Sequence, residues 1–249
     1  MLTFVAEHVR SRLTDTGRQR VRAIVDPMLS PIGTIKRSAR STGLIALTFD
    51  DGPDPVVTVR LLDLLADRHL QATFFILTEK AQTMPDIIRR IRDGGHELAL
   101  HGDRHDRLTA LPVPEVRRRL KAARTMLEQL SETRIHYFRP PFGAQTLSTF
   151  LAARSVGLQV VGWGPYAEDW IERTPESAAS RALRGTRGGD IVLFHDGLEV
   201  PEGEMKPTFD RIRMIEFVLQ GLEERGLRPT TVGKMITASG ARRTAWFRA

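Results

Sequence analysis

The sequence contains no cysteine. Disulfides and thiolate metal sites are therefore excluded, and a bound metal ion would need His, Asp or Glu ligands. Long apolar runs are also lacking, since a stretch such as Phe74-Phe75-Ile76-Leu77 is far too short to span a bilayer. The first residues lack the apolar core of a secretory signal. We therefore expect a cytoplasmic location without a transmembrane helix if Met1 is the natural start.

The positive charge of the chain is concentrated at its two ends. Net charge is +7 over 249 residues, yet residues 44–240 carry 26 basic and 27 acidic side chains. Residues 1–43 hold 8 Lys/Arg against 3 Asp/Glu, and residues 241–249 add 3 Arg without an acid. Basic ends suit weak contact with the anionic inner leaflet of a membrane, or serve only solubility. The near-neutral body argues against nucleic-acid binding.

The apolar pattern predicts three segments: a basic N-terminal helical extension (1–43), a body (44–240) and a basic C-terminal tail (241–249). Within the body, strand-like runs alternate with helical patterns about seven times, which predicts an α/β fold with a parallel sheet. Doubly wound and barrel arrangements both fit this order. The expected strands are 44–49, 72–77, 97–100, 136–138, 158–163, 190–194 and 229–232. The expected helices are 55–68, 84–93, 114–130, 145–156, 175–186 and 208–225.

Two adjacent carboxylates, Asp50 and Asp51, follow the first of these strands, where Gly52 and Pro53 must end it. Neighbouring like charges are costly unless a cation or a proton holds them. The same residues are also ordinary turn formers, so this segment alone favours a turn.

Other polar clusters also follow predicted strands. His101 and His105 are four residues apart, and two imidazoles with a carboxylate such as Asp51 form a common open site for a divalent ion. Arg139 could fix a carboxylate through a charge-assisted bond. Two further clusters are Glu168-Asp169-Trp170 and Phe194-His195-Asp196. In parallel α/β folds such strand ends are where active sites assemble, so we interpret the chain as an enzyme.

Five segments, in this order, resemble the motifs of the polysaccharide deacetylase family, also called the NodB homology domain or carbohydrate esterase family 4. The resemblance extends from about Leu44 to about Ile236. Three positions depart from the usual motifs: Gly102 stands where Ser or Thr is usual, Phe142 where Tyr is frequent, and Tyr166 where many members carry Asp. The matching segments are Thr48–Pro53, His101–His105, Arg139–Gly143, Asp169-Trp170 and Leu193–His195.

The resemblance implies a distorted, TIM-like (β/α) barrel of about seven strands and metal-dependent hydrolysis of N-acetyl groups on amino sugars. It also implies one divalent ion, Zn²⁺ first, with Co²⁺, Mn²⁺ or Ni²⁺ as alternatives. By this resemblance Asp51, His101 and His105 are the metal ligands.

The remaining roles also follow from the resemblance. Asp50 would be the general base, oriented by Arg139, and His195 the general acid, tuned by Asp169. The backbone N–H of Phe142 would stabilise the oxyanion, while Trp170 and Leu193 would line the acyl pocket. The substrate-binding set is thus Phe142, Trp170, Leu193, Pro141 and Tyr166.

The predicted substrate is an N-acylated amino sugar or glycan, free in the cell or linked to a lipid carrier. Two alternatives stay open: a deformylase of a formamido sugar on a lipid carrier, and a catalytically dead glycan-binding module on the same fold. Gly197–Pro207 is a candidate substrate-shaping loop.

Overall fold

The computed structural model describes residues 33–200, 203 and 205–245. The predicted N-terminal helix and its membrane contact therefore lie outside the described residues. Within the described part of the chain, no helix is long and apolar enough to cross a membrane.

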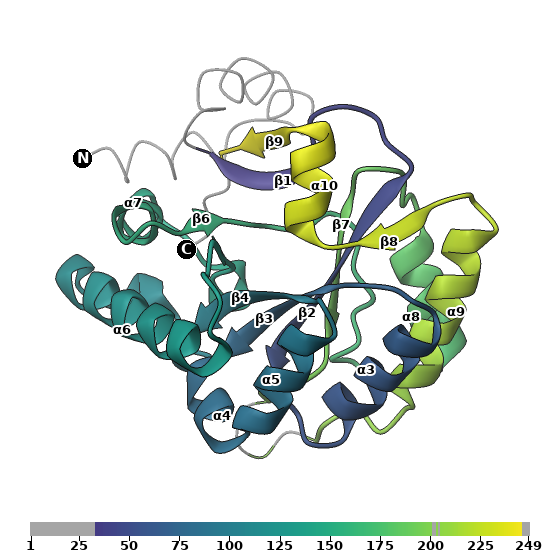
Figure 1. Ribbon diagram of the computed structural model, residues 1–249, viewed down its shortest axis with the longest axis horizontal. Helices are drawn as coiled ribbons and strands as arrows, with labels where there is room; N and C mark the ends of the chain where they lie inside the picture. Colours follow the sequence, from purple (N-terminus) through teal and green to yellow (C-terminus); the bar gives the residue numbers. More distant parts are fainter. Residues whose placement is uncertain (1–32, 201–202, 204, 246–249) are drawn as a thin grey trace.

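A parallel sheet of 7 strands forms the centre of the fold (Figure 1). Its order is β6-β5-β4-β3-β2-β7, and β8 pairs with the first residues of β2. The strands are β2 (Leu44–Gly52), β3 (Thr73–Leu77), β4 (Glu97–Gly102), β5 (Tyr137–Phe138), β6 (Gln159–Val160), β7 (Ile191–His195) and β8 (Arg228–Thr230). Apolar residues dominate β2, β3 and β7 because both faces of these strands are buried.

The two sheet edges, β6 and β7, are linked by short bridges. β1 (Thr34–Ser38) contacts Val161 next to β6 in parallel and Asp190 next to β7 in antiparallel orientation. A parallel bridge between Tyr166 and Leu193 adds a second link. These bridges close the sheet into a distorted barrel, which confirms the predicted fold class.

The described parts of both basic ends belong to this barrel. β1 pairs antiparallel with β9 (Ala241–Thr244) in a sheet of 2 strands. The sequence placed both segments outside the body, because neither has the apolar pattern of a core strand. The folded unit therefore includes residues on either side of the expected boundaries at 44 and 240.

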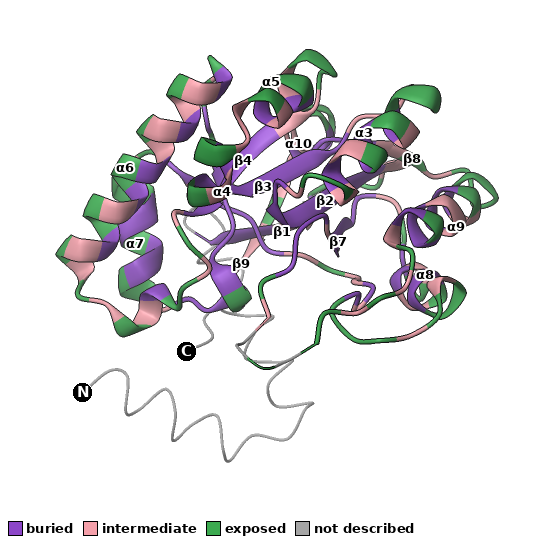
Figure 2. Cartoon of the chain, turned by 90° about the horizontal axis from the view of Figure 1, so that it is seen from below, coloured by how far each residue is buried: buried purple, intermediate pink, exposed green. Residues whose placement is uncertain are grey.

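Helices surround the strands on the outside (Figure 1). They are α3 (Val57–Asp67), α4 (Thr78–Thr83), α5 (Pro85–Asp93), α6 (Val113–Ser131), α7 (Leu147–Ser155), α8 (Pro175–Leu183), α9 (Arg211–Glu223) and α10 (Val232–Ser239). Their inner faces are buried and their outer faces exposed (Figure 2). In α3, for example, Leu61, Leu62 and Leu65 are buried, and each contributes roughly 1.5–3 kcal/mol to stability.

The sequence missed α4 and α10. Thr78–Thr83 has only 6 residues, too few to produce a recognisable apolar period. Val232 was expected to end a strand, but it begins α10 because the side chain of Thr231 accepts a hydrogen bond from the amide of Lys234 and so caps that helix.

Candidate active site

Two β-bulges shape the strands that carry the candidate metal ligands. The register between β2 and β3 shifts between Asp50 and Gly52, which makes Asp51 the extra residue, with φ 69°. The register between β3 and β4 shifts in the same way at His101. In a regular strand, neighbouring side chains point to opposite faces, whereas a bulge redirects one of them. Asp50 and Asp51 can therefore both serve the same end of the barrel.

Asp51, His101 and His105 come together as a candidate metal centre. Oδ1 of Asp51 lies 3.2 Å from Nε2 of His101 and 3.5 Å from Nε2 of His105. The three ligand atoms all lie within 4.8 Å of one another. Oδ1 is buried and has no hydrogen-bond partner among the described residues. Two imidazole nitrogens and a carboxylate oxygen converging on one point fit a divalent ion of the zinc type.

The protonation states of this cluster are those that a cation requires. Burial raises the pKa of Asp51, but its interactions with His101 and, more weakly, with His195 and His105 outweigh burial and lower the pKa, so the carboxylate stays ionised. Burial lowers the pKa of His105 to about 4, which keeps its imidazole neutral at pH 7. An ionised carboxylate and a neutral imidazole are the forms that bind metals.

The backbone of the segment after β5 orients His101. Nδ1 of His101 lies 2.8 Å from the carbonyl oxygen of Arg139. A carbonyl only accepts, so Nδ1 must carry the proton and Nε2 presents its lone pair to the cluster. Fixing the tautomer of a ligating imidazole in this way is a common feature of metal sites.

Asp50 and Arg139 form a buried ion pair beside this centre. Nη1 of Arg139 donates to Oδ1 of Asp50 over 2.6 Å and to Oγ1 of Thr48 over 2.9 Å, while Nη2 donates to the carbonyl oxygen of Gly162. The side chain of Arg139 is fully buried, and its guanidinium also lies over the ring of Phe75. Asp50 is thus held in a fixed orientation while its Oδ2 faces Nε2 of His101 at 4.0 Å.

His195 forms a second pair with Asp169 at the end of β7. Nδ1 of His195 lies 2.7 Å from Oδ1 of Asp169, and its backbone N–H donates to Oδ2 over 2.8 Å. Burial lowers the pKa of His195, but the charge and hydrogen bond of Asp169 outweigh it and raise the pKa to about 9. The imidazole therefore holds a proton at neutral pH, with Nε2 directed away from Asp169.

Aromatic side chains line the rim of the site. Trp170 is 40% exposed, packs edge-on against His195 and stacks on Tyr166 at a centroid distance of 5.8 Å. Phe142 is 51% exposed and contacts the ring of His105 at 4.2 Å. Pro141 and Leu193, also expected at the site, are buried. Such exposed rings could pack against the apolar faces of sugar rings.

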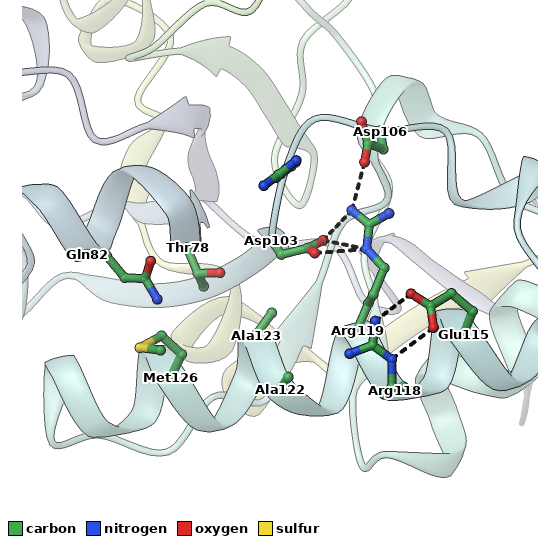
Figure 3. A pocket seen from close by; sticks show the side chains of 11 residues that line it. Thr78, Gln82, Asp103, Asp106, Glu115, Arg118, Arg119, Ala122, Ala123 and Met126 are labelled. Atoms are coloured by element: carbon green, nitrogen blue, oxygen red, sulfur yellow. Dashed lines mark hydrogen bonds and ion pairs between the residues drawn. The ribbon is translucent and has the colours of Figure 1, made fainter.

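Arg119 of α6 holds the segment between the two histidines (Figure 3). Its guanidinium donates to both carboxylate oxygens of Asp103 at 2.6–3.0 Å and to Oδ2 of Asp106 at 2.8 Å. Gly102 has φ 141°, and a Cβ there would lie 3.0 Å from the carbonyl oxygen of Arg104. The conformation of this loop therefore disfavours a residue with a side chain at position 102, and the guanidinium of Arg119 supports the loop from outside.

The described start of the candidate substrate-shaping loop is tied to the metal centre. Lys80 of α4 donates to the carbonyl oxygen of Asp51 over 2.9 Å and pairs with Glu199 at 2.5 Å. The amide of Glu199 in turn donates to Oδ2 of Asp51 over 3.4 Å. This segment therefore borders the site, although residues 201–202 and 204 of the loop lie outside the described residues.

Sequence reasoning missed three residues that support the site: Thr48, Lys80 and Arg119. Thr48 precedes Asp50 by two positions in a strand, so the alternation of side chains along a strand was the signal that could have found it. Nothing in the sequence distinguishes Arg119 from Arg117 and Arg118, because the three are consecutive arginines in one helical segment. The tertiary structure distinguishes them: Arg119 reaches Asp103 and Asp106 in the loop, whereas Arg118 pairs with Glu115 on its own helix.

Comparison with known proteins agrees with the motifs. Residues 37–161 match the family model described as polysaccharide deacetylase. A chitooligosaccharide deacetylase of Sinorhizobium fredii is 34% identical over 72% of this chain and 83% of its own length.

Solved structures of the same family are also similar to this chain. The Bc1960 peptidoglycan N-acetylglucosamine deacetylase is 25% identical, with a TM-score of 0.73 over 86% of this chain and 94% of that one. A family 4 acetyl xylan esterase of Clostridium thermocellum, in complex with a cobalt ion, is 31% identical, with a TM-score of 0.69 over 78% of this chain and 91% of that one. The chain described here belongs to the polysaccharide deacetylase family.

Proposed function

We propose that this protein is a metal-dependent de-N-acetylase of an amino sugar or glycan. The observation that carries the proposal is the convergence of Asp51, His101 and His105 between the Asp50–Arg139 and His195–Asp169 pairs. Deacetylase relatives that act on chitooligosaccharide and on peptidoglycan N-acetylglucosamine support it.

Asp51, His101 and His105 would hold one divalent ion, and Zn²⁺ fits two nitrogens and one carboxylate oxygen best. When bound, the ion supplies Lewis acidity toward the amide carbonyl and the attacking water.

The residues around this centre divide the proton transfers. Asp50, fixed by Arg139, accepts the proton of the attacking water, since its free oxygen faces the cluster. His195 carries a proton on the atom directed away from Asp169 and gives it to the leaving nitrogen, which otherwise leaves poorly as an amine anion. The backbone N–H of Phe142 stabilises the developing oxyanion.

The rim residues Trp170 and Tyr166 contact the sugar, and buried Leu193 with Pro141 bounds the acyl pocket. Intact base and acid pairs argue against a catalytically dead glycan-binding module. A cytoplasmic location, with a substrate inside the cell or on a lipid carrier, stays part of the prediction.

The test measures the acid released from a panel of substrates by metal-reconstituted protein. N-acetylglucosamine oligomers should release acetate, and their N-formyl counterparts and acetylated xylan test formamide and ester cleavage. Release of acetate only from xylan, or only of formate from the formyl sugars, would replace the proposed reaction. Release of neither acid from any substrate by protein containing one ion per chain would overturn it.

A further inference from the structure

One guanidinium at the rim of the site lacks a carboxylate partner. Arg107 lies two residues beyond His105 and is exposed, and its carbon Cζ sits 4.7 Å from the ring centroid of Phe142. No carboxylate of the described residues lies within ion-pair distance of Arg107. The same ring also contacts the imidazole of His105, a candidate metal ligand, at a centroid distance of 4.2 Å.

The neighbouring charges are already neutralised. Arg104, in the same loop, pairs with Glu79 at 3.2 Å. Asp106, the acid adjacent to Arg107 in sequence, pairs with Arg119 at 2.8 Å. Asp103 is occupied by the same arginine. Among the described residues, the rim beside His105 therefore keeps one uncompensated positive charge, that of Arg107.

The way in which Arg107 is held determines what it can bind. Stacking on Phe142 occupies one face of the guanidinium plane and leaves the N–H groups at its edge free. Those donors form a fork that matches two oxygens of a carboxylate or a phosphate. The aromatic support also reduces the conformational freedom that an exposed arginine would lose on binding.

We propose that Arg107 and Phe142 form a subsite for an anionic group, a carboxylate or phosphate, carried by the saccharide substrate. The inference rests on the proposed deacetylase function and narrows its substrate class from amino sugars and glycans in general to those that carry an anionic group. The acetamido group would lie at the metal centre, and the anionic group would lie further along the rim, beside Phe142.

The test compares kcat/KM for acetate release from three substrates of different charge. These are a neutral N-acetylglucosamine tetramer, a tetramer in which uronic acid alternates with N-acetylglucosamine, and N-acetylglucosamine 1-phosphate. We expect wild type to have a higher kcat/KM for an acidic substrate than for the neutral tetramer. In Arg107→Gln, kcat/KM for the acidic substrate should fall by about 5- to 10-fold, while kcat/KM for the neutral tetramer is unaffected. The two acidic substrates distinguish a sugar acid from a sugar phosphate.

Arg117→Gln is the matched control, because it removes the same charge from an exposed position on α6. Arg107→Lys, which keeps the charge without the fork, should retain only part of the preference. Equal kcat/KM for the neutral and both acidic substrates in wild type, or an acidic preference that survives in Arg107→Gln, would overturn the proposal.

Binding separates this inference from the proposed reaction. Calorimetry with Asp50→Asn protein measures the affinity for the neutral and uronate tetramers and the sugar phosphate without turnover. The subsite is supported if Asp50→Asn binds an acidic ligand more tightly than the neutral tetramer and this difference disappears in Asp50→Asn/Arg107→Gln. That result counts even if no substrate is hydrolysed. Equal affinities in both proteins contradict it, whatever the activity.

Discussion

His101 donates a hydrogen bond from Nδ1 to the carbonyl oxygen of Arg139, 2.8 Å away. The same arginine uses its side chain to hold Asp50. A single residue after β5 thus serves a metal ligand through its backbone and the candidate base through its guanidinium. The roles of the Arg139 carbonyl and of its guanidinium can be tested separately, because a substitution of Arg139 changes the side chain and leaves the backbone carbonyl in place.

Arg139→Lys should therefore lower kcat without weakening metal binding. A lysine ammonium cannot reproduce the fork that reaches Asp50, Thr48 and the carbonyl oxygen of Gly162, so Asp50 loses its orientation. We expect kcat to fall by about 10- to 100-fold. Steady-state kinetics and a metal titration check this, with Arg118→Lys on the surface of α6 as the control. Wild-type kcat in a folded Arg139→Lys protein would disprove this role.

Arg119→Gln should weaken the metal site from a distance. The substitution releases Asp103 and Asp106, which lie between and beside the two histidines, so the loop no longer presents both imidazoles together. Outer residues that position ligands typically contribute 10- to 100-fold in metal affinity, and we expect about 10-fold here. Competition with a chromophoric chelator measures the Kd.

The adjacent Arg118→Gln provides the matched control, because Glu115 is the one acidic partner of Arg118 in the described part of the chain. Both variants should show the circular dichroism of wild type. If Arg118→Gln and Arg119→Gln bind the ion equally well, the pairing of Arg119 with Asp103 and Asp106 does not position the loop.

The pH dependence of the reaction should report the His195–Asp169 pair. A general acid whose pKa is raised to about 9 stays protonated below that value, so kcat/KM should fall as the pH rises through about 9. Asp169→Asn removes the charge that raises this pKa. We expect the alkaline limb to move to lower pH and kcat/KM at pH 7 to drop by about 10²–10⁴-fold. An unmoved alkaline limb would show that another group is the acid.

His96 should make the fold sensitive to acid. Burial lowers its pKa to about 4, and its Nδ1 accepts a hydrogen bond from the amide of Ala72. Because the folded state binds this proton less readily than the unfolded chain, the stabilisation is complete above pH 6.5 and is lost as the pH falls toward 4. The loss amounts to roughly 2–3 kcal/mol.

Urea unfolding at pH 7 and pH 4.5 measures that loss. His96→Asn keeps an acceptor but cannot titrate, so its stability should change less between the two pH values than that of wild type. His69→Asn is the control, because His69 is exposed and its φ of 53° suits asparagine. The same pH sensitivity in all three proteins would exclude His96 as its source.

The alternation of apolar runs and helical periods was enough to locate the central strands, since buried parallel strands have a distinct apolar signal. The motif residues also indicated which side chains meet, because strands of a parallel sheet end on the same side. The bulges at Asp51 and His101 could not be predicted, since they depend on register between strands distant in sequence. For the same reason the pairing of β1 with β9 was invisible, as each strand finds its partner only in the folded barrel.

The residues that surround and support the site were harder to predict than the site residues themselves. Asp50 and His195 belong to short motifs, whereas Arg119 and Arg107 are single arginines in a chain with 37 basic residues. Their different surroundings, two carboxylates for Arg119 and an aromatic face for Arg107, arise from tertiary contacts. Sequence patterns carry no information on such pairings.

In the proposed active site, Asp51, His101 and His105 bind a divalent ion, while Asp50 takes part only in the chemistry. Metal content and acetate release, measured together for wild type, Asp50→Asn and His105→Ala, test it most directly. We predict about one Zn²⁺ per chain in wild type and Asp50→Asn, with acetate release only in wild type, and loss of both metal and activity in His105→Ala. Full metal binding by His105→Ala, or wild-type acetate release by Asp50→Asn, would contradict the account.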